Sequence, residues 1–313
     1  MGRRVTDKVG PMRAFVTGGK GFVGTWLVSH LQEHGDEVVV VDRELDVCDG
    51  AAMSTALAEV APDAVYHLAA VSHVGRSWAE PEQVIRVNVL GTLHVLEAAR
   101  RCRPMPRVLL VSSAEVYGAL DESALPTDED TPLAPVTPYA ASKAAAEFVG
   151  VQAQLGNGVP VIRVRPFNHV GPGQASSFVV PALARRIIEA RRQGRYTVKV
   201  GNLSPRRDLT DVRDVVRAYR LVIEHGVPGD VYNVCSGRAW SIGEVADRLL
   251  DLAGTRLQLV EDPELLRPVD VPVVLGDPAK IRTVTGWTPQ IDIERTLADV
   301  LEEWDRRAAD TTT

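Results

Sequence analysis

Three side chains in the sequence could together move a proton at a carbonyl or hydroxyl oxygen: Ser113, Tyr139 and Lys143. Tyr139 and Lys143 are four residues apart, a spacing that places both on one face of a helix, about one turn apart. A neighbouring ammonium favours the charged form of a phenol and lowers its pKa, so the pair could act as an acid and a base. Ser113 follows an apolar run and could hold the reacting oxygen against Tyr139. A Tyr and a Lys at this spacing also occur by chance, so the prediction depends on the elements around them.

A glycine-rich turn at residues 18–24 lies between two apolar runs. Residues 13–17 precede the turn, and a helical pattern follows it. Residues 37–42 then read as a fully buried strand. This β–turn–α–β order is typical of dinucleotide-binding folds, in which glycines let a pyrophosphate approach the backbone at a helix N-terminus.

The choice of dinucleotide depends on the end of the second strand. Asp42 lies eighteen residues after Gly24, the last glycine of the turn. Its carboxylate would accept hydrogen bonds from the adenosine ribose and repel a 2′-phosphate, which favours NAD. Arg43 beside it could receive that phosphate, so NADP stays possible. We therefore predict that Ser113, Tyr139 and Lys143 move a proton while a nicotinamide moves a hydride.

Alternating strands and helices position these residues. The predicted strands cover residues 64–70, 108–112 and 160–165, and the predicted helices cover residues 50–60, 82–103 and 139–155. Residues 196–200 and 231–234 are expected to be short strands in the less regular later part of the chain. Alternation of this kind predicts a doubly wound parallel sheet, in which ligands bind beyond the carboxyl ends of the strands. The glycine turn, the Ala69–Ala70 pair and Ser113 all fall at that edge.

The predicted fold class is therefore α/β: a Rossmann-type doubly wound parallel sheet with a smaller C-terminal α/β substrate-binding domain. We expect the cofactor domain over residues 12–170. The substrate domain is expected mainly over residues 171–306, with later chain crossings back into the first domain. Residues 1–11 and 307–313 are predicted to be a disordered extension and tail.

The composition excludes several classes of function. The 313-residue chain has a net charge of −6 and no dominant Lys/Arg stripe, which argues against a nucleic-acid partner. Its three cysteines form no CxxC pair, which favours a reduced, cytoplasmic location. The seven histidines lack ligand spacing, so no structural metal is expected. No apolar run is long enough to cross a membrane.

The glycine turn, Ser113 and the Tyr139–Lys143 pair resemble the extended short-chain dehydrogenase/reductases of the NAD-dependent epimerase/dehydratase family. These enzymes act on nucleotide sugars, and the resemblance runs from about residue 12 to residue 304. The C-terminal half is most similar to GDP-4-keto-6-deoxy-mannose reductases and their GDP-mannose 4,6-dehydratase relatives. The segments that carry this likeness are residues 167–174, 200–203, 207–214, 232–237, 267–268 and 285–289.

The resemblance implies a role for each matching position. Tyr139 would be the acid/base, Lys143 would lower its pKa and hold the nicotinamide ribose, and Ser113 would orient the C4 oxygen of the sugar. The residues implied to bind the cofactor are Gly18, Gly21, Phe22, Val23, Gly24, Asp42, Arg43, Asp46, Val47, Leu68, Ala69, Ala70, Tyr139 and Lys143. The residues implied to bind the nucleotide sugar are His73, Asn168, Val179, Asn202, Arg207 and Arg267. The resemblance also implies a homodimer, formed through a four-helix bundle of the helices near residues 84–101 and 139–155.

Two of the substrate residues have structural alternatives. Asn168 precedes a Gly-Pro-Gly loop, where asparagine commonly serves turn geometry. Arg207 could instead pair with Asp208 or Asp211. The two arginines would suit a diphosphate, which a planar guanidinium binds through two hydrogen bonds.

Three reactions share this machinery, because each exchanges a hydride between C4 of the sugar and the nicotinamide. A 4,6-dehydratase needs two further acid/base groups, to remove the C5 proton and to protonate the leaving C6 hydroxyl. Dehydratases of the family carry a hydroxyl or carboxyl group where this chain has Ala114, whereas Glu115 is retained as a candidate catalytic base. We predict a 4-keto-6-deoxy-hexose reductase. The alternatives are a 4-epimerase with tightly bound NAD and a 4,6-dehydratase, and the intact Ser113, Tyr139 and Lys143 argue against a non-catalytic NAD-sensing scaffold.

Overall fold

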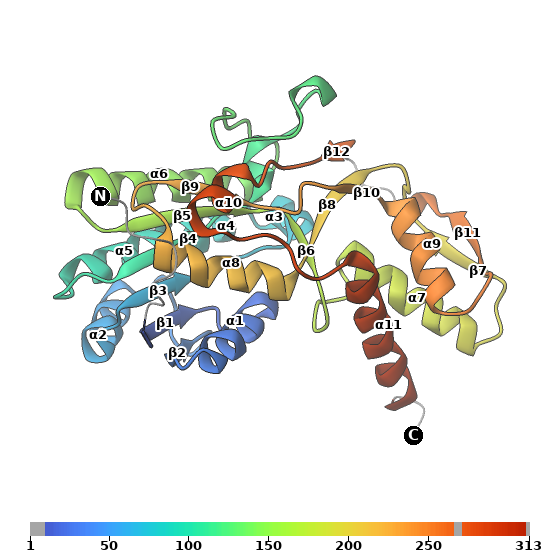
Figure 1. Cartoon of the computed structure of the whole chain (residues 1–313), viewed down its shortest axis with the longest axis horizontal. Coiled ribbons are helices and arrows are strands. Elements are labelled where there is room, and N and C mark those ends of the chain that lie inside the picture. Colours follow the sequence, from blue (N-terminus) through green and yellow to red (C-terminus); the bar gives the residue numbers. More distant parts are fainter. Residues whose placement is uncertain (1–9, 266–270, 311–313) are drawn as a thin grey trace.

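The computed structural model describes residues 10–265 and 271–310. The larger of its two parts is built on a six-stranded parallel sheet (Figure 1). Its strand order is β2-β1-β3-β4-β5-β9, so the direction of winding reverses between β1 and β3. This arrangement is the predicted doubly wound sheet. The strands are β1 (Arg13–Thr17), β2 (Glu37–Val41), β3 (Ala64–His67), β4 (Arg107–Val111), β5 (Val161–Pro166) and β9 (Val231–Val234).

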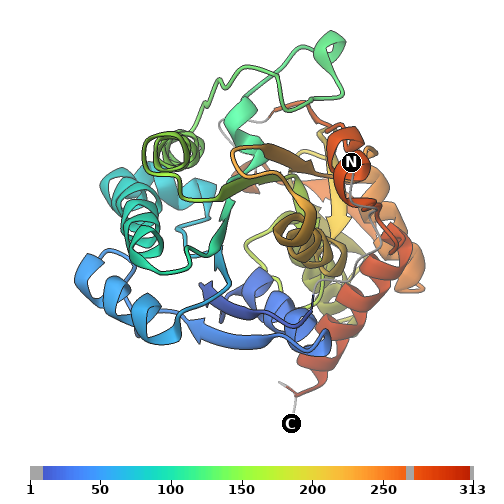
Figure 2. The same ribbon diagram turned by 60° about the vertical axis from the view of Figure 1, so that its left-hand side comes forward.

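Helices cover both faces of this sheet (Figure 2). One face packs against α1 (Phe22–Glu33) and α8 (Val212–His225), and the other packs against α2 (Gly50–Val60), α5 (Gly91–Arg101) and α6 (Pro138–Asn157). Side chains alternate along the strands: in β1, Val16 joins the first core and Phe15 the second. The near-continuous apolar runs of the central strands follow from this burial on both faces.

The rest of the chain forms a smaller part beside the carboxyl ends of the large sheet (Figure 1). Its strands are β6 (Asn168–Val170), β7 (Thr197–Val200), β8 (Arg206–Asp211), β10 (Ala239–Ser241), β11 (Gln258–Glu261) and β12 (Val273–Val274). Its main helices are α7 (Val179–Arg192), α9 (Ile242–Leu252) and α11 (Ile293–Asp310). The remaining helices of the chain are α3 (Val74–Ala79), α4 (Pro81–Ile85), α10 (Ala279–Thr285) and the short turns η1 (Arg86–Leu90), η2 (Ala114–Tyr117), η3 (Glu122–Ala124) and η4 (Pro263–Leu265).

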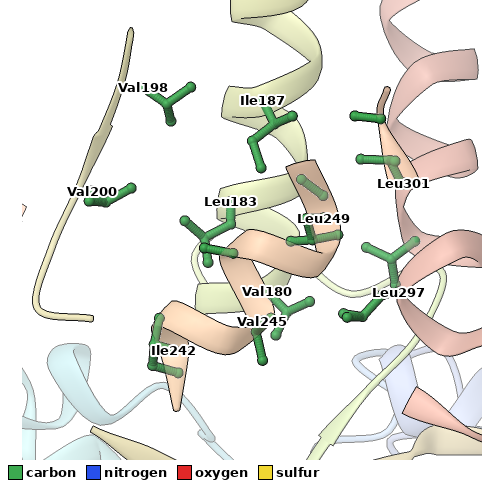
Figure 3. Packing of buried hydrophobic residues seen from close by; sticks show 14 of the residues in the cluster. Val180, Leu183, Ile187, Val198, Val200, Ile242, Val245, Leu249, Leu297 and Leu301 are labelled. Atoms are coloured by element: carbon green, nitrogen blue, oxygen red, sulfur yellow. The ribbon is translucent and has the colours of Figure 1, made fainter. Parts of the chain in front are cut away.

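The three main helices of the smaller part pack around their own apolar core (Figure 3). Leu183 and Ile187 of α7 meet Leu249 of α9 and Leu297 of α11, and all four are nearly fully buried. A capping box starts α9: the Glu244 amide donates to Ser241 Oγ over 3.0 Å, and the Ser241 amide donates to Glu244 Oε2 over 2.7 Å. The smaller part is therefore held by a second core rather than by the large sheet alone.

Three predicted elements differ from the structure. Strand β2 is half-buried rather than fully buried, because it is the edge strand and pairs only with β1. The single helix predicted over residues 82–103 is divided into α4, a π-helical turn η1 and α5. The helix α11 continues to Asp310, so residues 307–310 of the predicted tail are helical.

Other predictions lie wholly or partly outside the described residues. The N-terminal extension was predicted over residues 1–11, of which residues 1–9 are not described, and residues 266–270 contain the predicted substrate residue Arg267. Within the ranges that the structure describes, no helix is both long enough and apolar enough to cross a membrane.

Candidate active site

A cleft of about 1930 Å³ runs along the carboxyl ends of the large sheet toward the small one. This volume exceeds the roughly 300–1,000 Å³ that is typical for a single small ligand. Every predicted site residue within the described ranges lines it, from Gly18 and Asp42 at one end to Asn202 and Arg207 at the other. The cleft is therefore large enough to hold a dinucleotide and a second nucleotide end to end.

The glycine turn makes the floor of one end of the cleft. Gly18 has a φ of +68°, and a Cβ there would lie 2.8 Å from the Ala69 nitrogen. A Cβ on Gly24 would lie 2.2 Å from the Gly18 oxygen. Only glycine therefore allows this close approach of backbone to backbone. Gly21 is the N-cap of α1 and has no side-chain capping bond, so the start of the helix suits a pyrophosphate.

The carboxylate of Asp42 is held in place at the end of β2. It accepts hydrogen bonds from the Lys20 amide over 3.0 Å and from the Arg43 amide over 2.9 Å. Each carboxylate oxygen can accept further bonds, so it remains able to bind a ribose diol. The Lys20 ammonium lies 2.8 Å from Glu44, whereas the exposed Arg43 side chain lines the cleft. Asp46 and the buried Val47 continue this wall.

Ser113, Tyr139 and Lys143 come together from two elements. Ser113 follows β4 and caps η2, where its Oγ accepts from the Glu115 amide over 3.2 Å. Tyr139 and Lys143 lie on the first two turns of α6, both buried. Thr137 caps this helix by accepting from the Ala140 amide over 3.0 Å.

Burial dominates the electrostatics of the site. Burial raises the pKa of Tyr139 to about 12, while a hydrogen bond with Ser113 lowers it and the Glu115 carboxylate raises it. Burial also lowers the pKa of Lys143 to about 8, against the opposing charge of Glu147. The Lys143 ammonium donates to the Val111 carbonyl over 2.8 Å. Burial is thus the largest influence on the Tyr139 pKa, and the lowering of that pKa by Lys143 stays a prediction.

The predicted substrate residues come from four different elements. His73 caps α3, Asn168 begins β6, Val179 begins α7, and Arg207 lies on β8. Asn202 lies between β7 and β8, where its Oδ1 accepts from the Ser204 amide over 3.0 Å. No sequence motif could show that these separate segments meet.

Asn168 and Arg207 each lie in a strand of the smaller part of the molecule. Asn168 is not a turn residue, since it pairs with Leu209 in parallel strands. Arg207 donates from Nη1 to the Val271 carbonyl over 2.8 Å, which orients its guanidinium. The Asp208 carboxylate accepts from Ser236 Oγ over 2.5 Å, and Asp211 pairs with Arg213 over 2.7 Å.

Sequence reasoning missed two hydroxyl groups in the cleft. Ser112 Oγ and the Tyr219 hydroxyl are buried and have no hydrogen-bond partner among residues 10–265 and 271–310, and both residues line the cleft. An unpartnered buried hydroxyl costs free energy, so these two groups suit polar atoms of a bound ligand. The Ser112–Ser113 pair was a possible signal, because alternation along a strand turns neighbouring side chains to opposite sides. Tyr219 carries no signal, since it sits within an ordinary helical pattern.

Residues 10–265 and 271–310 contain no candidate metal site. No three histidine, cysteine or acidic side chains are grouped there as a metal site.

Comparisons with known proteins agree with this geometry. A family model described as GDP-mannose 4,6-dehydratase matches residues 43–300. GDP-6-deoxy-D-mannose reductase of Pseudomonas aeruginosa is 38% identical over 299 residues, covering 94% of this chain and 98% of that protein. The solved structure of RMD from Pseudomonas aeruginosa complexed with NADPH has a TM-score of 0.87 and 37% identity, covering 95% of this chain and 99% of that one.

A more distant relative has the same fold. The structure of UDP-glucose 4-epimerase from Thermotoga maritima with UDP-glucose has a TM-score of 0.87 and 26% identity, covering 95% of this chain and 100% of that one. The family model and the identity to the reductase each span most of the chain. This chain therefore belongs to the GDP-mannose 4,6-dehydratase family of extended short-chain dehydrogenase/reductases.

Proposed function

We propose that this protein is a nucleotide-sugar reductase that uses NAD(P)H to reduce the C4 keto group of a GDP-linked 4-keto-6-deoxy-hexose. The observation that carries the proposal is that the buried Tyr139 phenol and Ala114 both line the cleft. Burial raises the pKa of Tyr139 further above neutral, to about 12, so the phenol carries the proton that a reductase has to donate. Ala114 has no group that could protonate a leaving hydroxyl. The 38% identity to a GDP-6-deoxy-D-mannose reductase supports the same reaction.

Each residue has a distinct part in the proposed reaction. The cofactor, when bound by the glycine turn and Asp42, supplies a hydride to C4. Ser113 holds the C4 oxygen beside Tyr139, and Tyr139 gives its proton to that oxygen as negative charge develops there. The Lys143 ammonium stabilises the phenolate that remains. Exclusion of water by the buried walls strengthens these interactions.

The recognition of the two ligands is proposed to divide along the cleft. Residues 12–170 mainly bind the cofactor, and residues 171–306 mainly bind the nucleotide sugar. Asn168 contacts the sugar-phosphate region, while Arg207 and Arg267 bind the diphosphate or nucleotide. Asp42 favours NAD, and the exposed Arg43 allows NADP as well.

Two other reactions stay open to test. A 4-epimerase is favoured by Ala114, since epimerisation needs no second acid, and by the UDP-glucose 4-epimerase fold match. A 4,6-dehydratase is favoured by Glu115, which lines the cleft close enough to Tyr139 to raise its pKa. From that position Glu115 could remove the C5 proton.

One assay separates the three reactions. The purified protein is incubated with GDP-4-keto-6-deoxy-mannose, UDP-glucose or GDP-mannose while reduced-nicotinamide absorbance and product mass are followed. The reductase consumes one NAD(P)H per 4-keto sugar. Conversion at unchanged mass without net NAD(P)H consumption indicates an epimerase, and loss of one water indicates a dehydratase. The proposed reductase is contradicted if the protein acts as an epimerase or a dehydratase and does not consume NAD(P)H with the 4-keto sugar.

We also propose that the protein is a homodimer. Apolar side chains lie exposed on α4, η1, α5 and α6: Ile85, Leu90, Leu93 and Phe148. A shallow, almost wholly apolar groove of about 570 Å³ runs between these helices. Two copies of the α5–α6 pair would cover it as a four-helix bundle. The free cysteines are consistent with the cytoplasm, which we propose as its location.

A further inference from the structure

Tyr219 of α8 lies in the apolar core between α8 and the large sheet, and its side chain is fully buried. Val164 of β5 and Val234 of β9 belong to the same core. Leu68 and Val111 pack against this core, and both of them line the cleft, as Tyr219 itself does. The apolar core on the α8 face of the sheet therefore forms part of the cleft floor.

The hydroxyl of Tyr219 has no hydrogen-bond partner in the part of the chain that the structure describes. By contrast, the buried Tyr117 hydroxyl donates to Asn233 over 2.7 Å and accepts from Arg165 over 2.9 Å. A buried hydroxyl without a partner costs free energy that a phenylalanine would avoid. A ligand group that pairs with the Tyr219 hydroxyl would recover this free energy on binding.

The catalytic groups lie close to Tyr219. Burial raises the pKa of Tyr219, and the Tyr139 phenol lies near enough to raise that pKa further. On the same stretch of floor, the Val111 carbonyl accepts from the Lys143 ammonium over 2.8 Å. The nicotinamide has to lie beside these groups for its hydride to reach a carbonyl whose oxygen Tyr139 protonates. Tyr219 is therefore in the part of the cleft where the nicotinamide end of the cofactor would bind.

The nicotinamide ring carries one polar substituent, a carboxamide with a carbonyl acceptor and an amide donor. A neutral phenol can donate to the first and accept from the second. In the proposed reaction Ser113 and Tyr139 hold the C4 oxygen of the sugar, so that oxygen does not compete for Tyr219. Leu68 and Val111 are apolar, so they could pack against the ring but could not pair with its carboxamide.

We propose that Tyr219 is a cofactor-binding residue whose hydroxyl pairs with the nicotinamide carboxamide and holds the ring on the cleft floor. The inference rests on the proposed function, because it takes the bound cofactor to be NAD(P)H. Such a bond would strengthen binding of the nicotinamide end of the cofactor and leave binding of the adenosine end unchanged. This difference can be measured without turnover.

Tyr219→Phe removes the hydroxyl and keeps the ring that fills the core. Isothermal titration calorimetry with NADH, NADPH and ADP-ribose measures binding to each end of the cofactor, because ADP-ribose lacks the nicotinamide. We expect Tyr219→Phe to weaken binding of the preferred reduced cofactor about tenfold, a loss typical of one hydrogen bond. Its affinity for ADP-ribose should stay within about twofold of wild type, because the missing bond is made only to the nicotinamide.

Tyr66→Phe is the matched control. The Tyr66 hydroxyl is also buried and has no partner among the described residues, but Tyr66 does not line the cleft. We expect this variant to bind all three ligands like wild type. Without cofactor, the thermal midpoint should not fall in either variant, because neither loses a hydrogen bond of the free protein. A lower midpoint for Tyr219→Phe would show that its hydroxyl already pairs within the protein, which contradicts the proposal.

The proposal is overturned if Tyr219→Phe binds the reduced cofactor as tightly as wild type, or if it loses affinity for ADP-ribose to the same extent. It is also overturned if wild type binds neither NADH nor NADPH, and the proposed function then fails with it. A wild-type protein that binds the cofactor without reducing the 4-keto sugar contradicts only the proposed reductase. In that case the calorimetry still decides the role of Tyr219.

Discussion

At the scale of single residues, burial sets the chemistry of the site. Tyr139 and Lys143 are both less than a tenth exposed, so the phenolate of one and the ammonium of the other are disfavoured together. The phenol therefore stays protonated, while the ammonium titrates close to pH 8. This combination suits a phenol that donates its proton during turnover, because the nearby Lys143 ammonium can then stabilise the phenolate that is formed.

Replacing Tyr139 by phenylalanine should abolish catalysis without harming cofactor binding. The loss of a general acid lowers rates by about 10²–10⁴-fold, and the ring that fills the buried site is retained. Stopped-flow reduction of the 4-keto sugar measures the catalytic rate, and an NADH fluorescence titration measures cofactor binding. Tyr196→Phe is the control, because Tyr196 is 87% exposed. Activity of Tyr139→Phe within a few-fold of wild type would refute its role as the acid.

The pH dependence of kcat/KM should report Lys143. Its pKa is lowered to about 8, so the required ammonium is present below pH 8 and is lost as the pH rises. We expect kcat/KM to be level between pH 6 and 7.5 and to fall about tenfold per pH unit above about 8.5. Lys143→Arg keeps its charge in this range, so its residual activity should lack the alkaline limb. A wild-type profile that stays level to pH 10 contradicts the assignment.

At the scale of elements, a buried ion pair joins α6 to the strand beneath it. Glu147 lies one turn beyond Lys143 on α6, and its two carboxylate oxygens accept from Arg165 of β5 over 2.9 and 2.8 Å. Arg165 also donates to the Tyr117 hydroxyl over 2.9 Å, and Tyr117 donates to Asn233 of β9 over 2.7 Å. This network connects the catalytic helix to β5, η2 and β9, and it leaves the Arg165 pKa raised.

Removing Glu147 should destabilise the protein strongly. Glu147→Ala leaves the guanidinium of Arg165, a residue that is only 4% exposed, without its paired carboxylate. An uncompensated buried charge of this kind costs about 3–5 kcal/mol. Guanidinium chloride unfolding, followed by circular dichroism, measures the loss. Glu80→Ala is the control, because the Arg76–Glu80 pair lies on the surface and should leave the midpoint unchanged. An unchanged midpoint for Glu147→Ala would show that the network does not stabilise the fold.

At the scale of the whole molecule, two cores flank one cleft. The large sheet holds the glycine turn, Ser113 and Tyr139, and the second core of α7, α9 and α11 holds the opposite wall. The cleft runs between them, so its width depends on how the two parts pack. The loop of residues 171–174 links them, since Trp26 Nε1 donates to the Pro172 carbonyl over 2.9 Å and the Gly173 amide donates to Glu303 over 2.8 Å.

The proposed dimer can be tested on the apolar groove. Leu93→Asp places a charge among exposed apolar side chains on α5, where association would bury it. Light scattering should give the mass of one 33.9 kDa chain for this variant and twice that mass for wild type. Leu252→Asp is the control, because Leu252 is exposed to a similar degree, at 45%, at the end of α9. A wild-type protein of single-chain mass would contradict the proposal.

The sequence by itself determined the elements of the large sheet and the identity of the catalytic groups. Apolar runs that end in glycine, alanine or serine define strands buried on both faces, and Ser113, Tyr139 and Lys143 follow from local spacing. The α/β class was correct for this reason. The strand at residues 231–234 was also correct, although periodicity could not show that β9 joins the edge of the large sheet beside β5.

Only the tertiary structure decided the properties that depend on burial and on distant contacts. The π-helical turn interrupts an apolar stripe that fits one long helix, and within it Asn88 turns inward and bonds to Val71 and Ser142, which lie on other elements. The pKa of Tyr139 rises rather than falls, because desolvation depends on every element packed around the phenol. Short-range spacing specifies which catalytic side chains are present. Their protonation and orientation are set by packing between residues far apart in the chain.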